Sequence, residues 1–589
     1  MKRSSLFLSG KFFVAICLLF AIFAPVGDSA ERWIRRDEFC VALLEARGFP
    51  TEGLRTPASA YRKALDQDLV PVLGRPDAFM TRREALRYAI QSLHLTPEAT
   101  LLQSYPLPFG DISGLSQYER GCLAVAVSLD PQIVRPGKLF NPDRKVSHGE
   151  AEYWLQAIRK ASGGMTLHVV LEEEKGLSLI VHRENAFSRF VQWRTLMDGF
   201  SAREEASAVA DRMRAAKHTV FVDNSNYEWR IRSDLYDEKP KALRLAALGK
   251  KMGAVNVRVL PYQPIVEATG GPRFWVALVL DPSRYVLEPI IAPDGISTLC
   301  PLSDMDGGFK AAVNGGYFTK SAADKGYPIG TLMMRKRLLN APYRGRTCLG
   351  WSRLNTAAFG MVEWEGTVSH PSFGEKPISS LNRISKADAL HLFTPEYGGS
   401  TPVSSRPTQE LVLRKGRCVE RRSAAGPISQ GSVVIVGYGE AAGGLSNIAP
   451  GDAVEIRQSL NRGDADWNKC DSIIQAGPFI LSNGVIQSDN ENLSSGITER
   501  RHPRTVIGLT DRGKWMLWVG DGRNPIHSIG FTLDEAAKLL QKYGVVYALN
   551  LDGGGSSEMI YRNRIVNLPS EGKERVVSYG IGVRPRMAK

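Results

Sequence analysis

A run of three glycines directly after an acidic residue constrains this chain more than any other feature. Residues 550–557 read Asn-Leu-Asp-Gly-Gly-Gly-Ser-Ser and follow the apolar residues 545–549. The apolar stretch predicts a strand. Because glycine has no Cβ, the run after this strand can bring backbone N–H groups close to a ligand and form an anion-binding nest beside the Asp552 carboxylate. The alternative is a glycine-rich hairpin turn.

Similar segments, in which a short apolar stretch ends in glycine, lie on both sides of this run. Residues 311–318 read Ala-Ala-Val-Asn-Gly-Gly-Tyr-Phe, and residues 475–484 run from Gln-Ala-Gly-Pro to a Ser-Asn-Gly turn. The later segments 504–508, 519–523 and 566–575 read Arg-Thr-Val-Ile-Gly, Val-Gly-Asp-Gly-Arg and Val-Asn-Leu-Pro-Ser-Glu-Gly-Lys-Glu-Arg. In order and spacing these segments resemble the phosphodiester glycosidase family, over roughly residues 273–585.

The best-known members of that family remove N-acetylglucosamine from a sugar phosphodiester, so the resemblance implies a hydrolase of this kind. Such chemistry needs groups that hold phosphate and a carboxylate that acts as nucleophile, base or stabiliser of an oxocarbenium-like transition state. Asp552 is the predicted carboxylate because it follows the strand and precedes the glycines. Asp521 is the predicted second catalytic carboxylate, ahead of Glu558 and Glu574.

Phosphate and sugar contacts are expected from a further set of residues. Arg504 and Arg575 carry the guanidinium fork that suits bidentate phosphate contacts, with surface ion pairs as the alternative. Asn314 is expected to hydrogen-bond a sugar hydroxyl or a phosphate oxygen, with an Asn-Gly turn as the alternative. Small residues beside these groups complete the predicted substrate-binding set, namely Gly315, Gly316, Gly553, Gly554, Gly555 and Ser556. His502 and His527 lie nearby in sequence and are left out of this set.

The sequence does not decide whether a metal is needed. Asp552, Asp521 and backbone carbonyls offer the oxygen ligands that calcium prefers, but no acidic loop of the EF-hand type is present. No dinucleotide-binding fingerprint, P-loop or nucleophile elbow stands out either. No cofactor is therefore predicted, with a calcium ion as the open alternative.

The first thirty residues have the pattern of a secretory signal peptide. Lys2, Arg3 and Lys11 precede an apolar run over residues 12–23, and small residues follow near Ala30. The apolar run is short for a membrane span, although an uncleaved anchor is the alternative. We therefore expect an exported protein of the cell envelope, either periplasmic or on the cell surface.

Length and charge bound the rest of the prediction. A chain of 589 residues is too long for one hydrophobic core, so three or four domains are expected. Removal of residues 1–30 takes three basic residues and one acidic residue from the formal charge of +14, which leaves +12. This charge favours anionic partners such as wall polymers or phosphorylated glycans, and nucleic acid fits poorly with export. Six cysteines remain outside the signal segment, and disulfides would suit an oxidising compartment.

Residues 31–165 carry a weak repeat that resembles S-layer homology modules. Helix starts are expected near Arg36, Arg82 and His148, and three copies would make one trefoil-like module of the kind that holds proteins to envelope polysaccharides. Arg36 and Arg82 match the glycan-contacting arginine of that family, whereas His148 takes its place in the third copy. The alternative is that Thr81 with Glu84, and the equivalent pair in the third copy, are only helix caps.

Residues 166–265 predict a second unit with the element order β-α-β-β-α-β. This ferredoxin-like order resembles the SPOR domain, a binder of peptidoglycan glycan strands, and the alternative is a spacer that packs on the catalytic domain. A helix cap at Ser201 and Glu204 begins its first helix. Residues 261–272 look like a linker, and residues 266–589 are expected to form a strand-rich α+β domain with one helix that Thr532 and Glu535 cap.

The predicted protein is thus multidomain and α+β, with glycan-binding N-terminal modules and a C-terminal phosphodiester glycosidase domain. Its predicted activity is the hydrolysis of a sugar–phosphate diester in a glycan or wall polymer. Two other functions stay open, a non-enzymatic tether between glycan layers and a glycosidase that acts on peptidoglycan without phosphate.

Overall fold

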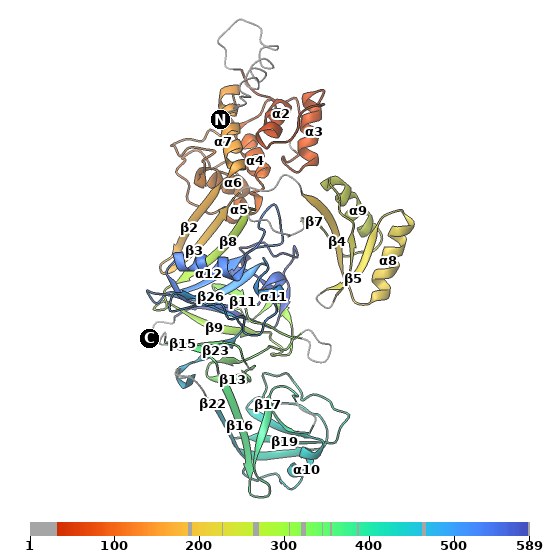
Figure 1. Cartoon of the computed structure of the whole chain (residues 1–589), viewed down its shortest axis with the longest axis vertical. Coiled ribbons are helices and arrows are strands. Elements are labelled where there is room, and N and C mark those ends of the chain that lie inside the picture. The colour runs from red at the N-terminus through yellow and green to blue at the C-terminus, as the bar shows by residue number, and fades with distance from the viewer. Residues whose placement is uncertain are drawn as a thin grey trace, which may run out of the picture.

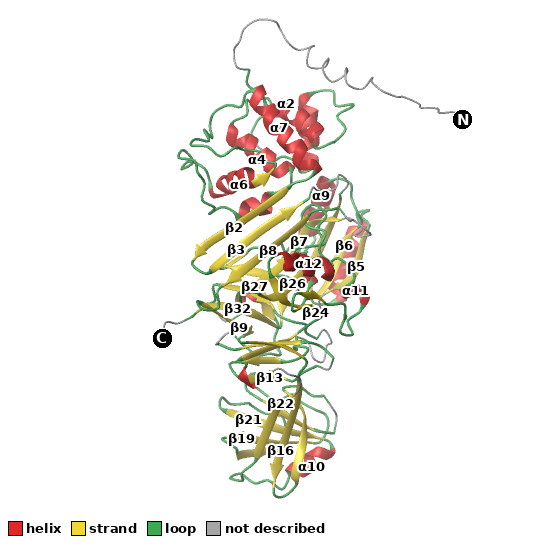
Figure 2. Ribbon diagram, turned by 60° about the vertical axis from the view of Figure 1, so that its left-hand side comes forward, coloured by secondary structure: helices red, strands yellow, loops and turns green. Residues whose placement is uncertain are grey.

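The computed structural model describes residues 32–586, with gaps at residues 73, 186–190, 226–227, 263–269, 306, 320–325, 344, 354–355, 386–387 and 462–466. The predicted signal segment and the middle of the predicted linker therefore lie outside the described residues. The described chain is elongated, with a helical module at one end, a β-rich central body, and a β subdomain at the other end (Figures 1 and 2). No helix in this part of the chain has the length and apolar character needed to cross a lipid bilayer.

The helical module lies between residues 32 and 165. Its helices are α2 (Arg36–Ala46), α3 (Pro57–Asp66), α4 (Arg82–Ser92), α5 (Thr96–Leu101), α6 (Gln117–Ser128) and α7 (His148–Gly163). The starts of α2, α4 and α7 meet at one centre, because isolated β-bridges join Trp33 to Ser147, Arg35 to Phe79 and Thr81 to Lys145. The three predicted helix starts are thus brought together as one module.

Ion pairs run around this centre from each copy to another. Arg36 pairs with Glu84 at 2.5 Å, Arg82 pairs with Glu150, and His148 lies 3.9 Å from Glu38. The two arginines that match the glycan-contacting position are therefore engaged within the module. Wall binding through them stays a prediction.

The ferredoxin-like unit consists of residues 192–262. It runs β4 (Gln192–Phe200), α8 (Arg203–Ala215), β5 (Val220–Ser225), β6 (Glu228–Ser233), α9 (Lys239–Lys251) and β7 (Asn256–Tyr262). The sheet order is β5-β6-β4-β7, with both helices on its outer side (Figure 1). The helix α8 begins one residue later than predicted, and Ser201 bonds to Glu205 rather than to Glu204.

A nine-stranded antiparallel sheet forms the centre of the molecule. Its order is β1 (Leu129–Asp130), β2 (Thr166–Glu174), β3 (Leu177–Glu184), β8 (Arg273–Leu280), β27 (Trp515–Gly520), β26 (Arg504–Thr510), β28 (Val545–Asn550), β24 (Phe479–Ser482) and β25 (Val485–Ile486). The helix α12 (Leu533–Lys542) packs its apolar face on this sheet, and its predicted Thr532–Glu535 cap is confirmed.

The position of β2 and β3 corrects the predicted boundary between the two N-terminal units and the catalytic domain. The sequence prediction places residues 166–184 in the ferredoxin-like unit, but β3 pairs with β8 along its whole length, with Glu184 opposite Arg273. The reason is that the alternate residues Leu177, Leu179, Val181 and Arg183 of β3 are all buried, and the strand pairs with both β2 and β8. The ferredoxin-like unit is therefore an insertion at one end of the β3–β8 pair.

Two smaller sheets and an inserted subdomain complete the C-terminal region. The first has the order β30 (Arg564–Ile565), β29 (Met559–Tyr561), β11 (Ala311–Asn314), β32 (Tyr579–Pro585) and β9 (Tyr285–Ile291). The second has the order β13 (Arg337–Asn340), β12 (Leu332–Met334), β23 (Ser472–Gln475), β14 (Cys348–Trp351) and β15 (Ala357–Gly360). A two-stranded ribbon pairs β10 (Cys300–Pro301) with β31 (Val576–Val577), and the short helices are η1 (Leu302–Asp304), η2 (Trp467–Lys469), α11 (Ser495–Thr498) and η3 (Gly554–Ser556).

The inserted subdomain lies between β15 and β23, at the far end from the helical module (Figure 1). It is a seven-stranded sheet with the helix α10 (Glu440–Leu445) and the order β20 (Arg417–Arg422), β19 (Thr408–Arg414), β21 (Ser432–Tyr438), β18 (Leu390–Phe393), β17 (Gly374–Leu381), β16 (Glu363–His370) and β22 (Glu455–Asn461). It has its own core, which the sequence analysis did not separate from the catalytic core. No disulfide joins cysteines within the described chain.

A buried charge network joins the helical module to the central nine-stranded sheet. The Arg183 side chain on β3 and the Glu98 side chain on α5 are both fully buried and lie 3.3 Å apart. Arg183 also donates to the backbone oxygen of His527, and the His527 ring bonds to Asp521 at 2.9 Å. Removal of one partner would leave an uncompensated buried charge, which typically costs about 3–5 kcal/mol.

We predict that the isolated fragment 266–589 does not fold into a soluble domain. It lacks β3, so the apolar residues of β8 would form an open sheet edge, and it lacks both Arg183 and Glu98. Expression with size-exclusion chromatography and thermal unfolding checks this. The control replaces residues 187–270 in the full chain by a short glycine-containing turn between the paired Glu184 and Arg273, and it should stay folded. A monomeric 266–589 fragment with cooperative unfolding would contradict the prediction.

Candidate active site

One large cavity lies where the central body faces the ferredoxin-like unit. Its volume is about 1450 Å³, and residues from both units line it. The catalytic side includes Asp552 with Gly553, Gly554 and Gly555. Of the predicted site residues, Arg504 and Arg575 also line this cavity, whereas Asp521, Asn314, Gly315, Gly316 and Ser556 do not.

The segment that carries Asp552 is held in place by strands on both sides. It follows the central strand β28, and the Leu551 N–H donates to Thr505 O on β26 at 2.8 Å. The Asp552 N–H donates to Gly315 O at 3.1 Å, and Asn314 Nδ2 donates to Asp552 O at 2.8 Å. The backbone on which the Asp552 carboxylate stands is therefore fixed from two sheets.

The asparagine and glycines at residues 314–316 lie beneath the cavity rather than in it. Asn314 is 1% exposed, and its Oδ1 accepts from Thr505 Oγ1 and from the Glu558 N–H at 2.7 and 3.1 Å. A Cβ on Gly315 would lie 2.3 Å from the Tyr579 ring, so close packing requires this glycine. Asn314 thus positions Asp552 instead of contacting a ligand, and sequence patterns do not distinguish these roles.

The glycine run has a different use from the predicted nest. The Gly553 N–H donates to Asp552 Oδ1 at 3.0 Å, and the Gly554 N–H donates to Pro503 O at 2.9 Å. Two of the N–H groups that the nest would need are thus engaged within the protein. A Cβ on Gly555 would lie 2.1 Å from Arg575 Nη2, and Gly554 has a φ of +65°. Glycine is required here because arginines pack against the backbone.

Arg575 lies against the glycine run and is paired. Its guanidinium forms an ion pair with Glu571, and its Nη1 donates to Ser556 Oγ at 3.3 Å. Ser556 is 1% exposed and therefore acts through Arg575 rather than directly. The predicted bidentate phosphate contact from Arg575 would have to compete with the Glu571 carboxylate.

Arg504 is held by backbone carbonyls. Its Nε donates to Phe531 O at 3.1 Å, and its Nη2 donates to Ile497 O and Arg500 O at 2.7 and 2.8 Å. Burial lowers the pKa of Arg504 to about 10. Its Nη1 makes no hydrogen bond within the described chain, so one side of the fork is left for a ligand. A fully bidentate contact is not available.

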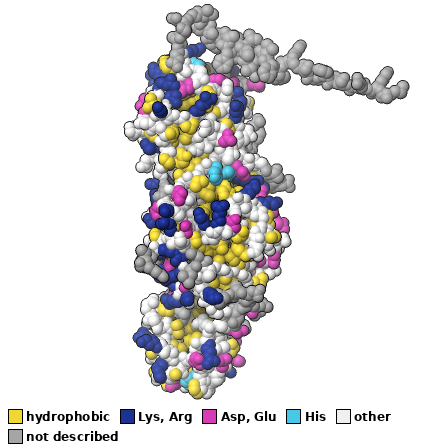
Figure 3. Space-filling view, turned by 90° about the vertical axis from the view of Figure 1, so that its left-hand side faces the viewer, with side chains coloured by type: hydrophobic (Ala, Val, Ile, Leu, Met, Phe, Trp, Pro, Cys, Tyr) yellow, Lys and Arg dark blue, Asp and Glu magenta, His cyan; other side chains and the backbone are white. Residues whose placement is uncertain are grey.

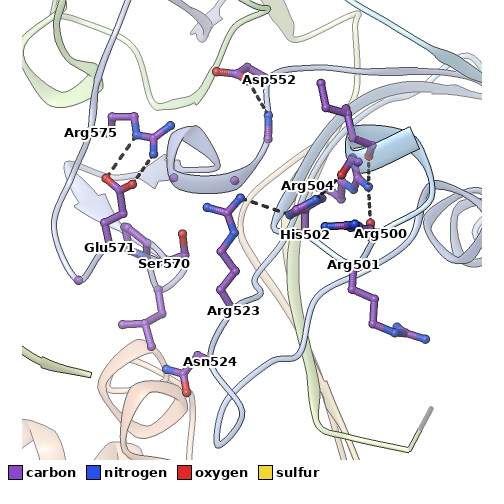
Figure 4. A pocket seen from close by; sticks show the side chains of 18 of the residues that line it. Arg500, Arg501, His502, Arg504, Arg523, Asn524, Asp552, Ser570, Glu571 and Arg575 are labelled. Atoms are coloured by element: carbon purple, nitrogen blue, oxygen red, sulfur yellow. Dashed lines mark hydrogen bonds and ion pairs between the residues drawn. The ribbon is translucent and has the colours of Figure 1, made fainter. Parts of the chain in front are cut away.

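Arg523 is the main site residue that the sequence analysis missed. Figure 4 shows its guanidinium between His502 and the Arg575–Glu571 pair. Its Nη2 lies 3.2 Å from His502 Nδ1, and Arg523 lines the cavity. Burial, the largest cause, lowers the pKa of Arg523, and the nearby charge of Arg575 lowers it further. The signal was present in the Gly-Asp-Gly-Arg motif, where only the aspartate was chosen.

His502 orients Arg523. Its Nε2 lies 2.8 Å from Gly496 O, which fixes Nε2 as the donor and Nδ1 as the acceptor for Arg523. Burial, the largest cause, lowers the pKa of His502, and nearby arginines lower it further. The ring is thus neutral at pH 7 and serves as a hydrogen-bond acceptor beside three arginines.

Asp521 lies outside the cavity, which corrects its prediction as the second catalytic carboxylate. It is 1% exposed; Oδ1 accepts from Asn567 Nδ2 at 2.8 Å, and Oδ2 accepts from the Leu568 N–H at 2.7 Å and bonds to His527. The burial of Asp521 follows from its place at the end of β27, against β8. Asp521 therefore fixes the segment 566–575 that carries Arg575.

The two other acidic candidates form a pair behind the site. Burial, the largest cause, raises the pKa of Glu558 to about 9, and a hydrogen bond with Glu574 raises it further. Glu574 is held by the N–H and the hydroxyl of Ser303 at 2.7 Å each. Neither carboxyl lines the cavity, so neither is a second catalytic group.

The calcium alternative receives no support from the donor groups. Asp521 and Asp552 do not face the same space, and the Asp521 oxygens are engaged with three protein donors. Within the described residues, no group of three or more His, Cys, Asp or Glu side chains is placed to hold a metal ion.

Positive charge dominates the cavity. Its lining has three carboxylates, from Glu499, Asp552 and Glu571, against nine arginines, namely Arg194, Arg230, Arg232, Arg346, Arg500, Arg501, Arg504, Arg523 and Arg575. On the outer face in Figure 3, basic and acidic side chains are instead mixed along the molecule. The excess of arginine in the cavity suits an anionic ligand.

Comparison with known proteins agrees with this site. Residues 408–584 match the model of the phosphodiester glycosidase family. This matched region is under a third of the chain and contains Asp552, Arg504, Arg523 and Arg575. It begins in the inserted subdomain and ends in the last strand, β32.

Individual relatives match over short stretches. Human N-acetylglucosamine-1-phosphodiester alpha-N-acetylglucosaminidase is 38% identical over 113 residues, 19% of this chain and 19% of that protein. The prophage-derived protein YomE of Bacillus subtilis is 36% identical over 77 residues, 13% of this chain and 12% of that protein. The chain thus matches less than a fifth of the length of these relatives.

A solved structure shows a related fold. A protein of solved structure from Burkholderia pseudomallei superposes with a TM-score of 0.52 over 71% of this chain and 96% of that chain, at 20% identity. This likeness concerns the fold, and it extends well beyond the 408–584 region.

We predict that Glu558→Gln stabilises the protein more at high pH than at low pH. Because the pKa of Glu558 rises from 4.5 to about 9 on folding, the folded state holds a proton that the unfolded state has lost. The wild-type free energy of unfolding therefore falls as pH rises between these values, by up to about 1.4 kcal/mol per pH unit. Urea unfolding at pH 5, 7 and 8 measures this.

The matched control is Glu204→Gln on the exposed side of α8, which should follow the wild-type profile. If the Glu558→Gln and wild-type unfolding free energies stay parallel from pH 5 to pH 8, the assignment of a protonated Glu558 is wrong.

Proposed function

We propose that this protein is an exported hydrolase that cleaves the bond between a sugar anomeric carbon and a phosphodiester in a glycan or wall polymer. The observation that carries the proposal is the position of the Asp552 carboxylate in a cavity lined by nine arginines. The match of this region to the phosphodiester glycosidase family supports the same chemistry. N-Acetylglucosamine is the proposed sugar, since the named human relative acts on its 1-phosphodiester.

The reaction breaks the bond between the anomeric carbon and the bridging phosphate oxygen. The electron pair stays on that oxygen, so the phosphate leaves as a monoester with one more negative charge. Water supplies the hydroxyl that ends on the anomeric carbon, and its proton balances the charge of the products. Leaving-group protonation is needed less than for an alkoxide, because the phosphate charge is spread over several oxygens.

Asp552 has two roles open to it in this scheme. As nucleophile it would form a glycosyl ester that water then hydrolyses, and as base it would take the proton of the attacking water. Among the described residues that line the cavity, no second carboxylate has an equivalent position, because Glu571 is paired with Arg575 and Glu499 lies on the exposed rim. Both roles require an ionised Asp552.

The arginines supply the electrostatic part of the reaction. Charge develops on the phosphate as the bond breaks, and fixed cations placed there stabilise the transition state more than the ground state. Arg523 is the principal candidate because His502 orients it by one nitrogen only. Arg504 Nη1 is the second, since the rest of that guanidinium is held rigidly by carbonyls.

We further propose that the N-terminal units hold the enzyme to envelope glycans. Two observations support this: the three helix starts that meet at one centre and the ferredoxin-like strand order. The apolar N-terminal segment of the sequence supports export.

We predict that Asp552→Asn lowers kcat by about 100-fold or more while the protein stays folded, since an amide replaces the carboxylate proposed to act as nucleophile or base. The assay is the release of N-acetylglucosamine from its methyl phosphodiester by the full chain, with thermal unfolding to verify the fold. Asp534→Asn on the surface of α12, where the aspartate pairs with Lys538, is the control and should be fully active. An active Asp552→Asn enzyme would remove the central assignment.

We predict that Arg523→Gln weakens inhibition by inorganic phosphate about tenfold and lowers kcat/KM for the diester by at least as much. The reason is that a charge-assisted contact to phosphate is lost. Arg512→Gln, in the exposed turn after β26, removes the same charge away from the cavity and should leave both values unchanged. Equal phosphate inhibition of Arg523→Gln and wild type would place the phosphate elsewhere.

A further inference from the structure

The ferredoxin-like unit forms part of the cavity wall through one face of its sheet. Side chains alternate along its strands, so that Trp193 and Thr195 on β4 face the helices, where Thr195 Oγ1 donates to Ala242 O on α9. The next residues along the strands line the cavity instead, namely Arg194, Leu196, Arg230, Arg232, Leu260 and Tyr262. Three of these six are arginines.

The three arginines have spare hydrogen-bonding capacity. Arg230 and Arg232 share the Asp223 carboxylate through their Nε atoms, and their terminal nitrogens make no hydrogen bond within the described chain. The Arg194 guanidinium lies 4.3 Å from the centre of the Tyr262 ring, and its Nε is buried with no hydrogen-bond partner. The Asp223 carboxylate thus pairs with two of the three cations.

Mutual repulsion within this cluster is visible in its electrostatics. Burial, the largest cause, lowers the pKa of Arg194, and the charges of Arg232 and Arg230 lower it further. Such a cluster is stabilised by a bound anion, because guanidinium groups bind phosphate and other oxyanions through paired N–H donors.

These arginines do not hold the ferredoxin-like unit in place. Among the described residues, the ion pairs between this unit and the central body come from Lys573, which lies 3.3 Å from Asp198 and 3.0 Å from Glu228, and Arg258 packs beside Gly572. A separate ion pair joins Lys239 on α9 to Asp68 in the helical module at 2.5 Å. The arginine cluster is therefore available for a ligand.

The size of the cavity also exceeds what one sugar phosphodiester needs. Its volume of about 1450 Å³ is above the roughly 300–1,000 Å³ of ordinary small-molecule sites. The Asp552 region and the arginine cluster are parts of the same cavity, so an elongated ligand can contact both.

We propose that Arg194, Arg230 and Arg232 form a second anion subsite, which binds a phosphate group in another repeat of the same substrate chain. The inference rests on the proposed function, and it adds that the preferred substrate is a polymer with repeated phosphodiesters. The ferredoxin-like unit is then part of the substrate site and not only a tether.

The test measures kcat/KM for two substrates, with wild type and with variants in which one or more of the three arginines are replaced. The first is a tetramer of N-acetylglucosamine 1-phosphate units joined by phosphodiester bonds, and the second is the methyl phosphodiester of one N-acetylglucosamine. Arg230→Gln, Arg232→Gln and the triple glutamine variant of the full chain should lower kcat/KM for the tetramer at least about tenfold more than for the monomer. Arg244→Gln on the exposed side of α9 is the control and should change neither value.

A binding measurement separates this proposal from the proposed function. Fluorescence anisotropy follows a labelled tetramer with the Asp552→Asn chain, with and without the Arg230→Gln and Arg232→Gln changes. If no substrate is cleaved by wild type but binding still falls about tenfold on loss of these arginines, the hydrolase assignment is wrong and the subsite is supported. If wild type cleaves both substrates and the arginine variants reduce both kcat/KM values equally or not at all, the subsite is wrong.

Discussion

The pairing of β3 with β8 is the interaction on which the rest of this structure depends. It joins a hairpin that follows the helical module to the first strand of the catalytic body, and it leaves Arg183 buried at the junction with Glu98 and His527. The same network reaches Asp521, which holds the segment that carries Arg575. The helical module is therefore connected to the site through buried charges and is not an independent appendage.

The site itself is organised by the electrostatics of arginine in a confined space. Carbonyl groups hold Arg504, a neutral histidine orients Arg523, and Glu571 pairs with Arg575. The three guanidinium groups therefore keep separate positions around one cavity instead of all pairing with the same carboxylate. An arrangement of this kind is suited to stabilise the charge that develops on a departing phosphate. The arginines on the ferredoxin-like wall of the cavity add positive charge at a distance from the reacting bond, where a second phosphate group of the substrate can bind.

The sequence prediction placed the segment after β28 at the cavity, but it did not separate the residues that line the cavity from those that support it. Asp552, Arg504, Arg575 and the glycines after Asp552 do line the cavity, because a polar segment that follows a buried strand must reach solvent at the strand end. Asn314 and Asp521 belong to similar motifs, yet both are buried beneath the site. A motif indicates that its residues lie near the site, but it does not show whether a side chain faces the cavity or points into the core beneath it.

The sequence alone determined the strand-rich α+β character, the repeated helix starts, the β-α-β-β-α-β order of residues 192–262 and the acidic residue before the glycines, since each follows from local periodicity and turn chemistry. Only the tertiary structure decided that β2 and β3 belong to the catalytic sheet, that residues 363–461 form an inserted subdomain, and that Arg523 faces the cavity while Asp521 does not. These features depend on contacts between residues far apart in the chain, such as Arg183 with His527, and local patterns carry no record of such contacts.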